Sequence, residues 1–177
     1  MVNSFVKPSF LVLALFLCFV PSFCSDKIVQ VNDICSKHKT PYNCAIILNS
    51  IPGVATDGAN INSLSPYLIN LAHANAFDTK TLINTLIQNT TDPNLKQHFI
   101  TCSMDYDDVL FSLTQAKDSF TSGNFIGMKS NSASVLEKVY DCDYKTPSTP
   151  LLKVNEDLED VTIIITILAD YLAGKYI

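Results

Sequence analysis

The fold of this chain is decided by residues 92–143, which read DPNLKQHFITCSMDYDDVLFSLTQAKDSFTSGNFIGMKSNSASVLEKVYDCD. Apolar side chains recur at every third or fourth position on both sides of the turn residues Thr121–Asn124, which is the spacing of one helix face. Asp92 followed by Pro93 is typical of a helix start. The repeating positions are Leu95, Phe99, Cys102, Tyr106, Val109, Leu113, Ala116 and Phe120, then Phe125, Met128, Ser132, Val135, Val139 and Cys142. We therefore predict two antiparallel helices joined by a tight turn.

A third helix is predicted before this pair. Its residues keep the same spacing from Ile61 to Leu86. Pro66 leaves two alternatives for the beginning of this helix. Either Ser65 caps a helix whose first residue is Pro66, or the helix begins earlier and Pro66 distorts its first turns.

A fourth helix is predicted from Val154 to Leu172, with acidic residues in its early turns, where they suit the helix dipole. Residues 161–167 are almost all β-branched and would also suit a buried strand. The helical spacing continues on both sides of this run, so we interpret it as helix. The prediction is an all-α fold in which residues 55–177 form an up-down-up-down four-helix bundle.

Two short apolar segments precede the bundle. A break at Lys39-Thr40-Pro41 separates them, and Ile51-Pro52-Gly53 ends the second. We expect residues 25–54 to form a short N-terminal helical hairpin that lacks a core of its own.

The first 24 residues have the features of a secretion signal. An unbroken apolar run covers Phe10–Val20 and is shorter than the roughly 20 residues that a membrane-spanning helix needs. Ser22 and Cys24 place small residues three and one positions before a cut at Ser25. We therefore predict a signal peptide over residues 1–24 and an exported mature chain without a membrane anchor.

Four cysteines remain in the exported chain, namely Cys35, Cys44, Cys102 and Cys142. An even number of cysteines in an exported protein indicates disulfides rather than free thiols. The midpoint between Cys102 and Cys142 falls in the predicted bundle turn, and the midpoint between Cys35 and Cys44 falls at the break of the predicted hairpin. Sequential pairing is the arrangement that fits both turns, so one disulfide closes the hairpin and the other joins two bundle helices.

The charge of the mature chain limits the classes of partner that it can bind. It carries 11 lysines, no arginine and 17 acidic residues, which gives a net charge of −6. Nucleic-acid binding depends on contacts from Arg and Lys to phosphates, so this composition excludes a nucleic-acid partner. The excess of acids suits a basic protein partner.

The sequence offers no constellation for catalysis. We expect His38 to be solvated near the hairpin turn, His73 to lie at the edge of the core and His98 to point outward. No nucleophile motif, phosphate-binding loop or zinc-ligand spacing is present in the sequence. We predict no catalytic residue, no cofactor and no metal site.

Two polar features suggest contacts at the surface. Asp105, Asp107 and Asp108 cluster on the second predicted bundle helix. Such a cluster is commonly a solvated face, and the alternatives are a cation site or a contact for a basic partner. Asn89-Thr90-Thr91 is a sequon in a predicted exposed loop, which makes Asn89 a predicted glycosylation site.

These residues together resemble the plant invertase and pectin methylesterase inhibitor family, including its pollen-allergen-like members. The features that carry the resemblance are Cys35, Pro41 three residues before Cys44, Leu48, the Cys102–Cys142 pair and Asp141-Cys142-Asp143. The resemblance covers the whole mature chain. It implies a non-enzymatic inhibitor that binds one-to-one to a carbohydrate-active enzyme of the cell wall or vacuole and blocks the substrate cleft with bundle helices.

The two branches of this family differ at the third bundle helix. Invertase inhibitors carry a Pro-Lys-Phe motif at its start, where this chain has Phe125-Ile126-Gly127. The resemblance therefore implies inhibition of pectin methylesterase, with invertase inhibition as the alternative. We expect a monomer in the extracellular space or apoplast, with the vacuole as the alternative location. We also expect Asp105 and Asp108 to contact the enzyme.

A secreted helical module that holds a small apolar ligand is the alternative of another class. Asn75, Thr79 and Ser132 place small polar side chains on the helix seams, which would leave the core loosely filled. Such a protein would have no inhibitory role.

Overall fold

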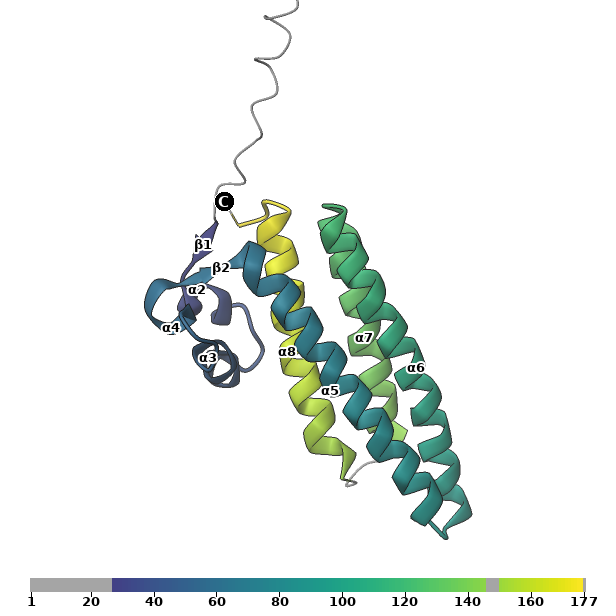
Figure 1. Ribbon diagram of the computed structural model, residues 1–177. Coiled ribbons are helices and arrows are strands. Elements are labelled where there is room, and N and C mark those ends of the chain that lie inside the picture. Colours follow the sequence, from purple (N-terminus) through teal and green to yellow (C-terminus); the bar gives the residue numbers. More distant parts are fainter. Residues whose placement is uncertain (1–26, 146–149, 177) are drawn as a thin grey trace, which may run out of the picture.

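The computed structural model describes residues 27–145 and 150–176, and the predicted signal peptide, residues 1–24, lies outside this part (Figure 1). Seven helices and one small sheet make up the described chain. Their order is β1 (Ile28–Val29), α2 (Val31–Cys35), α3 (Pro41–Asn49), α4 (Val54–Asp57), β2 (Ala59–Asn60), α5 (Ile61–Asn89), α6 (Pro93–Thr121), α7 (Phe125–Lys145) and α8 (Leu151–Leu172). The predicted all-α class is confirmed.

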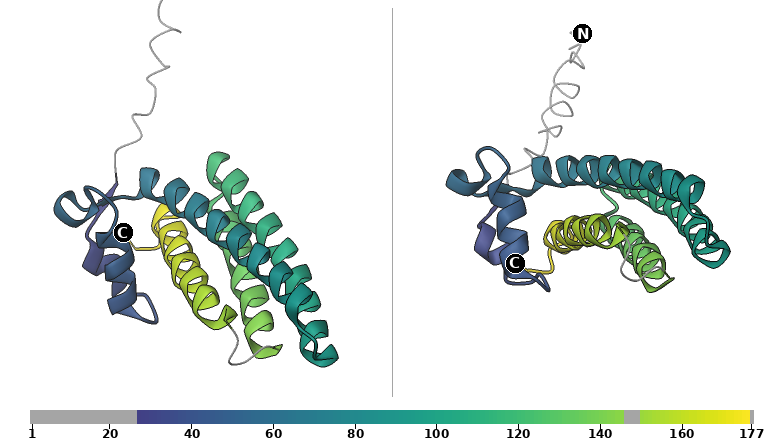
Figure 2. Two further views of the ribbon diagram at one scale, coloured as in Figure 1. Left: turned by 60° about the horizontal axis from the view of Figure 1, so that its bottom comes forward. Right: turned by 90° about the horizontal axis from the view of Figure 1, so that it is seen from below.

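The four long helices form the predicted bundle. Each packs against the next along the chain, and α8 returns to pack against α5, so the four close into a ring. Figure 2 shows two layers, with α5 and α6 in one and α8 and α7 in the other. The apolar positions predicted for the seams are buried between these layers, including Leu68, Tyr106, Val135 and Leu168. The β-branched run at 161–167 is helical, as predicted, and lies within α8.

The starts of two bundle helices follow from their caps. The side chain of Asp92 accepts hydrogen bonds from the backbone N–H groups of Asn94 and Leu95, which confirms the predicted cap of α6. In contrast, α5 begins at Ile61, with Asn60 as its cap, and Pro66 lies inside the helix. The alternative with Ser65 as the cap is therefore wrong, and the earlier start is correct.

The N-terminal part contains the predicted hairpin and two further elements. Helices α2 and α3 pack together, and Cys35 is bonded to Cys44 with a Cα–Cα distance of 5.5 Å. Helix α4 and the antiparallel pair β1–β2 were not predicted. Gly58, between α4 and β2, has a φ of +80°, and a Cβ there would lie 2.8 Å from Ile28. This position therefore favours glycine, because its φ is positive and the side chain of Ile28 lies so close.

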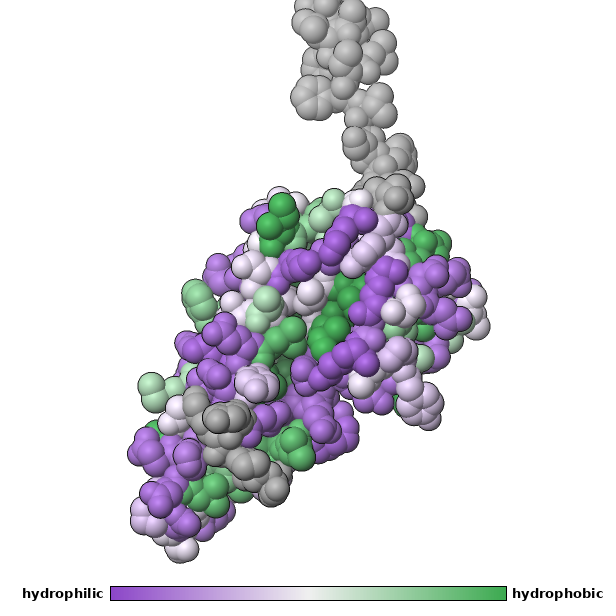
Figure 3. All heavy atoms as spheres, turned by 180° about the vertical axis from the view of Figure 1, so that it is seen from behind, coloured by the Kyte–Doolittle hydropathy of each residue, from purple (hydrophilic) through white to green (hydrophobic). Residues whose placement is uncertain are grey.

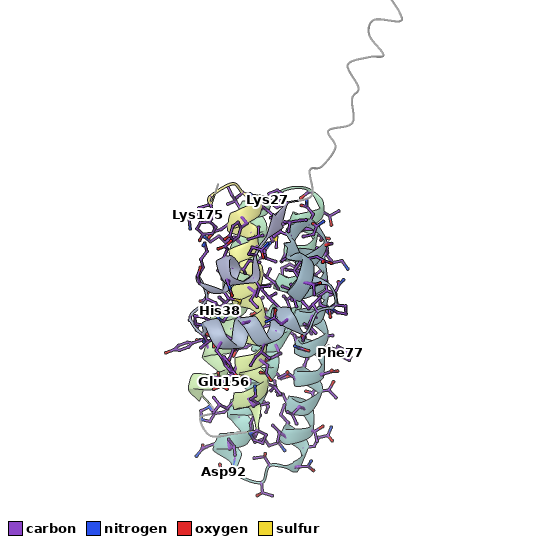
Figure 4. The ribbon with its side chains drawn as sticks, turned by 90° about the vertical axis from the view of Figure 1, so that its left-hand side faces the viewer. Lys27, His38, Phe77, Asp92, Glu156 and Lys175 are labelled. Atoms are coloured by element: carbon purple, nitrogen blue, oxygen red, sulfur yellow. A yellow bond between two sulfur atoms is a disulfide. The ribbon has the colours of Figure 1, made fainter. Side chains whose placement is uncertain are left out.

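Polar contacts fasten the N-terminal part to α8. The carboxylate of Asp160 accepts hydrogen bonds from the Thr40 hydroxyl at 3.0 Å and the Asn43 amide at 2.9 Å. His38, labelled in Figure 4, is buried rather than solvated, which corrects the expectation from the sequence. Its Nδ1 accepts from the Thr40 backbone N–H, so Nε2 is the protonated nitrogen and donates to the Asp160 carbonyl at 3.1 Å. The hairpin turn thus docks on α8 through a buried imidazole.

The second disulfide joins two bundle helices. Cys102 of α6 is bonded to Cys142 of α7, with a Cα–Cα distance of 4.8 Å, and this is the pairing that the turn positions predict. The bond fixes the register of α6 against α7, and therefore the residues that these helices expose together.

Candidate functional site

Helices α6 and α7 lie on the side of the bundle away from the N-terminal part (Figures 1 and 2). Helices α2 and α3 pack against α8, so the N-terminal part covers that side of the molecule and leaves α6 and α7 uncovered. A pair of long antiparallel helices presents a broad surface to a partner. We define the α6/α7 face by Met104, Asp108 and Phe111 on α6 and by Lys138 and Asp141 on α7.

Two large apolar side chains project from this face. Met104 is 65% exposed and Phe111 is 66% exposed. They lie seven residues apart on α6, two helical turns, and so point to the same side. Met and aromatic residues are enriched in protein interfaces, where they fill pockets of the partner. The sequence analysis missed both residues, although each falls outside the buried spacing of its helix, which was the available signal.

Acidic groups surround a single lysine at the junction of α6 and α7. The ammonium of Lys138 lies 3.0 Å from the carboxylate of Asp108 and 3.9 Å from that of Asp105. The hydrogen bond with Asp108 raises the pKa of Lys138, and the charges of Asp108, Asp105 and Asp141 add to this effect. Three acids around one charged lysine leave the face with a net negative charge.

The two acids expected to contact a partner differ in position. The side chain of Asp108 is 60% exposed, whereas Asp105 is 7% exposed. Asp105 follows Cys102 by three residues, so it lies close to the seam with α7. Asp105 is therefore buried rather than exposed, which corrects the expectation of an exposed acid, and its carboxylate lies 3.9 Å from the Lys138 ammonium. Asp107, the third acid of the cluster, forms an ion pair with Lys80 of α5.

The side of the bundle formed by α7 and α8 is less suited to inserting apolar side chains into a partner. Figure 3 views the molecule from behind, where α7 and α8 lie, and shows hydrophobic side chains gathered in a hollow strip bordered by hydrophilic ones. Helix α7 also exposes Ile126 and Tyr140. The strip is recessed, whereas Met104 and Phe111 project into solvent.

A buried hydrogen-bond chain lies beneath the disulfide between α6 and α7. The Tyr106 hydroxyl donates to the side-chain carbonyl of Asn155, whose amide donates to the carboxylate of Asp143. Burial raises the pKa of the Tyr106 hydroxyl and also the pKa of the Asp143 carboxyl. These three residues join α6, α8 and α7, so they support the α6/α7 face from inside.

The remaining residues do not assemble a reactive site. His73 and His98 are exposed, which confirms the outward position of His98 and places His73 outside the core. Across residues 27–145 and 150–176, no group of three or more His, Cys, Asp or Glu side chains is placed to hold a metal ion. The chemistry that the described surface supports is binding.

The hydroxyls of two small polar residues on the helix seams bond to carbonyls of their own helices. The hydroxyl of Thr79 donates to the carbonyl of Asn75, and that of Ser132 donates to the carbonyl of Met128. In the described part of the chain, every buried side-chain nitrogen or oxygen has a hydrogen-bond partner. Asn75 and Thr79 line an open groove between α5 and α8. These two residues therefore line an open groove and not an enclosed ligand cavity.

Asn89 is the last residue of α5 and is exposed. Within the described chain, no helix is both long enough and apolar enough to cross a bilayer.

Comparison with known proteins gives one consistent answer. The sequence model of the family described as plant invertase/pectin methylesterase inhibitor matches residues 29–167. A pectinesterase inhibitor from Actinidia deliciosa is 30% identical over 150 residues, which cover 82% of this chain and 80% of that protein. Pectinesterase inhibitor 2 from Arabidopsis thaliana is 26% identical over 117 residues, or 66% of each chain.

Solved structures share the fold. A pectin methylesterase inhibitor from Arabidopsis thaliana superposes with a TM-score of 0.62 at 19% identity and covers 81% of this chain and 95% of its own. A mutant form of a pectin methylesterase inhibitor from Arabidopsis gives a TM-score of 0.72 at 20% identity, with coverage of 80% and 95%. The four-helix ring, its two disulfides and the match over residues 29–167 lead to one conclusion. The chain belongs to the plant invertase/pectin methylesterase inhibitor family.

Proposed function

We propose that this protein inhibits pectin methylesterase by forming a one-to-one complex that covers the substrate cleft of the enzyme. The observation that carries the proposal is the 30% identity to a pectinesterase inhibitor over 82% of this chain. The family is one of inhibitors, so the protein acts by binding and not by catalysis. A rigid, disulfide-bonded helical bundle suits this role, since little conformational entropy is lost when it binds.

The α6/α7 face is the surface that we assign to the enzyme. Met104 and Phe111 supply apolar anchors, and the acids around Lys138 supply negative charge at their rim. An apolar centre with a charged rim is the usual composition of a stable protein interface. Asp108 is the exposed acid of this set and is the residue that we expect to contact the enzyme.

We propose that the protein is exported, with residues 1–24 as the signal peptide and the apoplast as its location. The N-terminal hairpin, residues 25–54, and the bundle, residues 55–177, then form a single inhibitor domain. The exposed position of Asn89 supports its glycosylation, because the sequon would be accessible during export. The mature protein is expected to be a monomer.

The test is a titration of pectin methylesterase with the oxidised protein, residues 25–177. Enzyme activity should fall linearly to a plateau at one equivalent of inhibitor, and size-exclusion chromatography with light scattering should give the mass of a one-to-one complex. Invertase, titrated in parallel, tests the other branch of the family and should keep its activity. Loss of invertase activity with pectin methylesterase unaffected would reverse the assignment. Activity of both enzymes without any complex would reject it.

A further inference from the structure

A second surface of the molecule carries the opposite charge. A pocket of about 390 Å³ lies where the first and last described residues meet. Its lining includes Lys27, Asp33, Lys37, Tyr171 and Tyr176. Figure 4 shows Lys27 and Lys175 at this end of the molecule, with Asp92 at the other end. We call these five lining residues the lysine–tyrosine pocket.

The lysines of this pocket differ from most lysines of the chain in their partners. The structure pairs six other lysines with carboxylates, namely Lys39, Lys80, Lys129, Lys138, Lys153 and Lys175. Among the side chains that the structure describes, Lys27 and Lys37 form no such ion pair. Lys27 donates to the carbonyl of Tyr171 at 2.7 Å, and Lys37 donates to the carbonyl of Asp33 at 3.1 Å. Both partners are neutral carbonyl groups, so neither ammonium is bonded to a carboxylate of the described chain.

Aromatic rings hold these ammonium groups at the pocket. The Nζ of Lys37 lies 4.7 Å from the ring centre of Tyr176 and 5.4 Å from that of Tyr171. The Nζ of Lys27 lies 6.0 Å from the ring centre of Tyr171. Cation–π contacts orient a lysine without neutralising it. An arriving carboxylate would therefore gain two charge-assisted hydrogen bonds from donors that are already positioned.

We propose that the lysine–tyrosine pocket binds a uronate oligosaccharide, a sugar chain that carries free carboxylates. The carboxylates would accept from Lys27 and Lys37. Sugar hydroxyls would donate to the Asp33 carboxylate and to the Tyr176 hydroxyl, whose own proton is donated to the Asp170 carboxylate at 3.2 Å. Asp33 disfavours a densely charged anion such as a polyphosphate and favours a ligand rich in hydroxyl groups.

This choice of ligand rests on the proposed function, because hydrolysis of a pectin methyl ester leaves a free uronate carboxylate. The pocket lies beside β1 and the end of α8, and the α6/α7 face lies on the other side of the bundle. The protein could therefore hold de-esterified polymer at one surface and the enzyme at another. It would accumulate where the enzyme has already acted.

The test is a titration of the oxidised protein, residues 25–177, with a galacturonate hexamer. The double variant Lys27→Gln/Lys37→Gln removes the two positive charges. Lys96→Gln/Lys117→Gln, at exposed positions of α6, removes the same charge elsewhere. Loss of two charge-assisted hydrogen bonds should weaken binding by about tenfold or more in the first variant. The control variant should bind as the wild type does.

Three outcomes would overturn the proposal. They are equal loss of affinity in both double variants, equal binding of the fully methyl-esterified hexamer, and displacement of the hexamer by inorganic phosphate at the same concentration. Lys27 also ties β1 to α8, so the double variant could fail to fold for a reason unrelated to ligand binding. Two readouts avoid this problem. One is the affinity of the single variant Lys37→Gln, and the other is the change in backbone amide NMR shifts of Gln30, Lys37 and Tyr176 when the wild-type protein binds the hexamer. Inhibition of pectin methylesterase by the same variants should be unchanged. Hexamer binding without any inhibition would reject only the proposed function.

Discussion

The ammonium of Lys138 on α7 lies 3.0 Å from the carboxylate of Asp108 on α6, and this ion pair links the two helices of the α6/α7 face. Asp108→Lys would place two cations together and reverse the charge offered to a partner. We expect the affinity for pectin methylesterase to fall by about tenfold, mainly through slower association. The free energy of unfolding should change by less than about 1 kcal/mol, because the pair is at the surface.

Surface plasmon resonance at two salt concentrations measures this effect. Asp78→Lys, at an exposed position on α5, makes the same charge change away from the α6/α7 face and should leave association unaffected. An equal loss in both variants would mean that only the net charge of the protein matters.

The apolar anchors make a separate prediction. Met104→Ala and Phe111→Ala should each weaken the complex by about 2 kcal/mol if they fill pockets of the enzyme. Unfolding should change by no more than about 0.5 kcal/mol, since both side chains are exposed. Phe77→Ala is the matched control, because Phe77 is 60% exposed and projects from α5 (Figure 4). Calorimetric titration of the three variants decides whether α6 carries the contact.

The two disulfides should contribute unequally to stability. In the chain-entropy account, the Cys102–Cys142 bond closes the larger loop and contributes roughly 4 kcal/mol, and the Cys35–Cys44 bond contributes roughly 2.7 kcal/mol. Replacing each pair with alanine and unfolding both variants in urea measures the difference. A larger loss from the Cys35/Cys44 variant would show that the hairpin, rather than the bundle, limits stability.

The docking of the hairpin on α8 depends on Asp160. In Asp160→Asn, the new amide would face the amide of Asn43 and could not satisfy all of the donors that the carboxylate accepts. We expect faster hydrogen exchange in α3, with α6 unchanged. Glu159→Gln removes the neighbouring surface ion pair with Lys39 and should have little effect. Faster hydrogen exchange throughout the bundle of Asp160→Asn would instead show that the N-terminal part and the bundle unfold as one cooperative unit.

The Asp143 carboxyl predicts a dependence of stability on pH. Burial raises its pKa, and the hydrogen bond from Asn155 only partly opposes this. The folded protein therefore holds this proton more tightly than the unfolded chain, so ionisation costs stability as the pH rises through the folded-state pKa. Asp143→Asn should raise the melting temperature at pH 7, and this gain should shrink as the pH falls.

Asp170 provides a control of opposite sign. Burial alone would raise its pKa, but hydrogen bonds and charges from Lys129 and Lys175 outweigh burial and lower it. Its contribution to stability is present above the unfolded pKa and is lost as the pH falls through the folded one. Asp170→Asn should therefore lower the melting temperature at pH 7, and this decrease should become smaller at acidic pH. A melting temperature of Asp143→Asn below that of the wild type at pH 7 would contradict the assignment for Asp143.

The bundle could be predicted from the sequence because its signals are periodic and repeated. The run at 161–167 has strand propensity, but tertiary packing of a continuous helical face overrides it, as the buried Ile164, Ile165 and Leu168 show. The pairing of β1 with β2 was missed because each strand has two residues, too few for an alternating pattern.

The errors concern residues whose surroundings come from distant parts of the chain. His38 is buried where it donates a hydrogen bond to the carbonyl of Asp160, which lies 122 positions away in the sequence. Nothing near His38 in the sequence indicates this contact. Asp105 and Asp108 read alike in sequence, yet their three-residue separation turns one toward the seam and leaves the other exposed. Whether a single polar residue at the edge of a helix face is exposed can therefore be decided only from the packed structure.

The bond from Lys27 to the carbonyl of Tyr171 brings the two ends of the described chain together. A domain with adjacent ends can be inserted in a loop of another protein, or rejoined end to end and reopened elsewhere. The turn between α5 and α6, at the opposite end of the molecule, is the natural place for new termini. A circular permutant opened there would keep both disulfide loops intact. If the protein were instead attached to another chain through its original ends, the α6/α7 face would remain free.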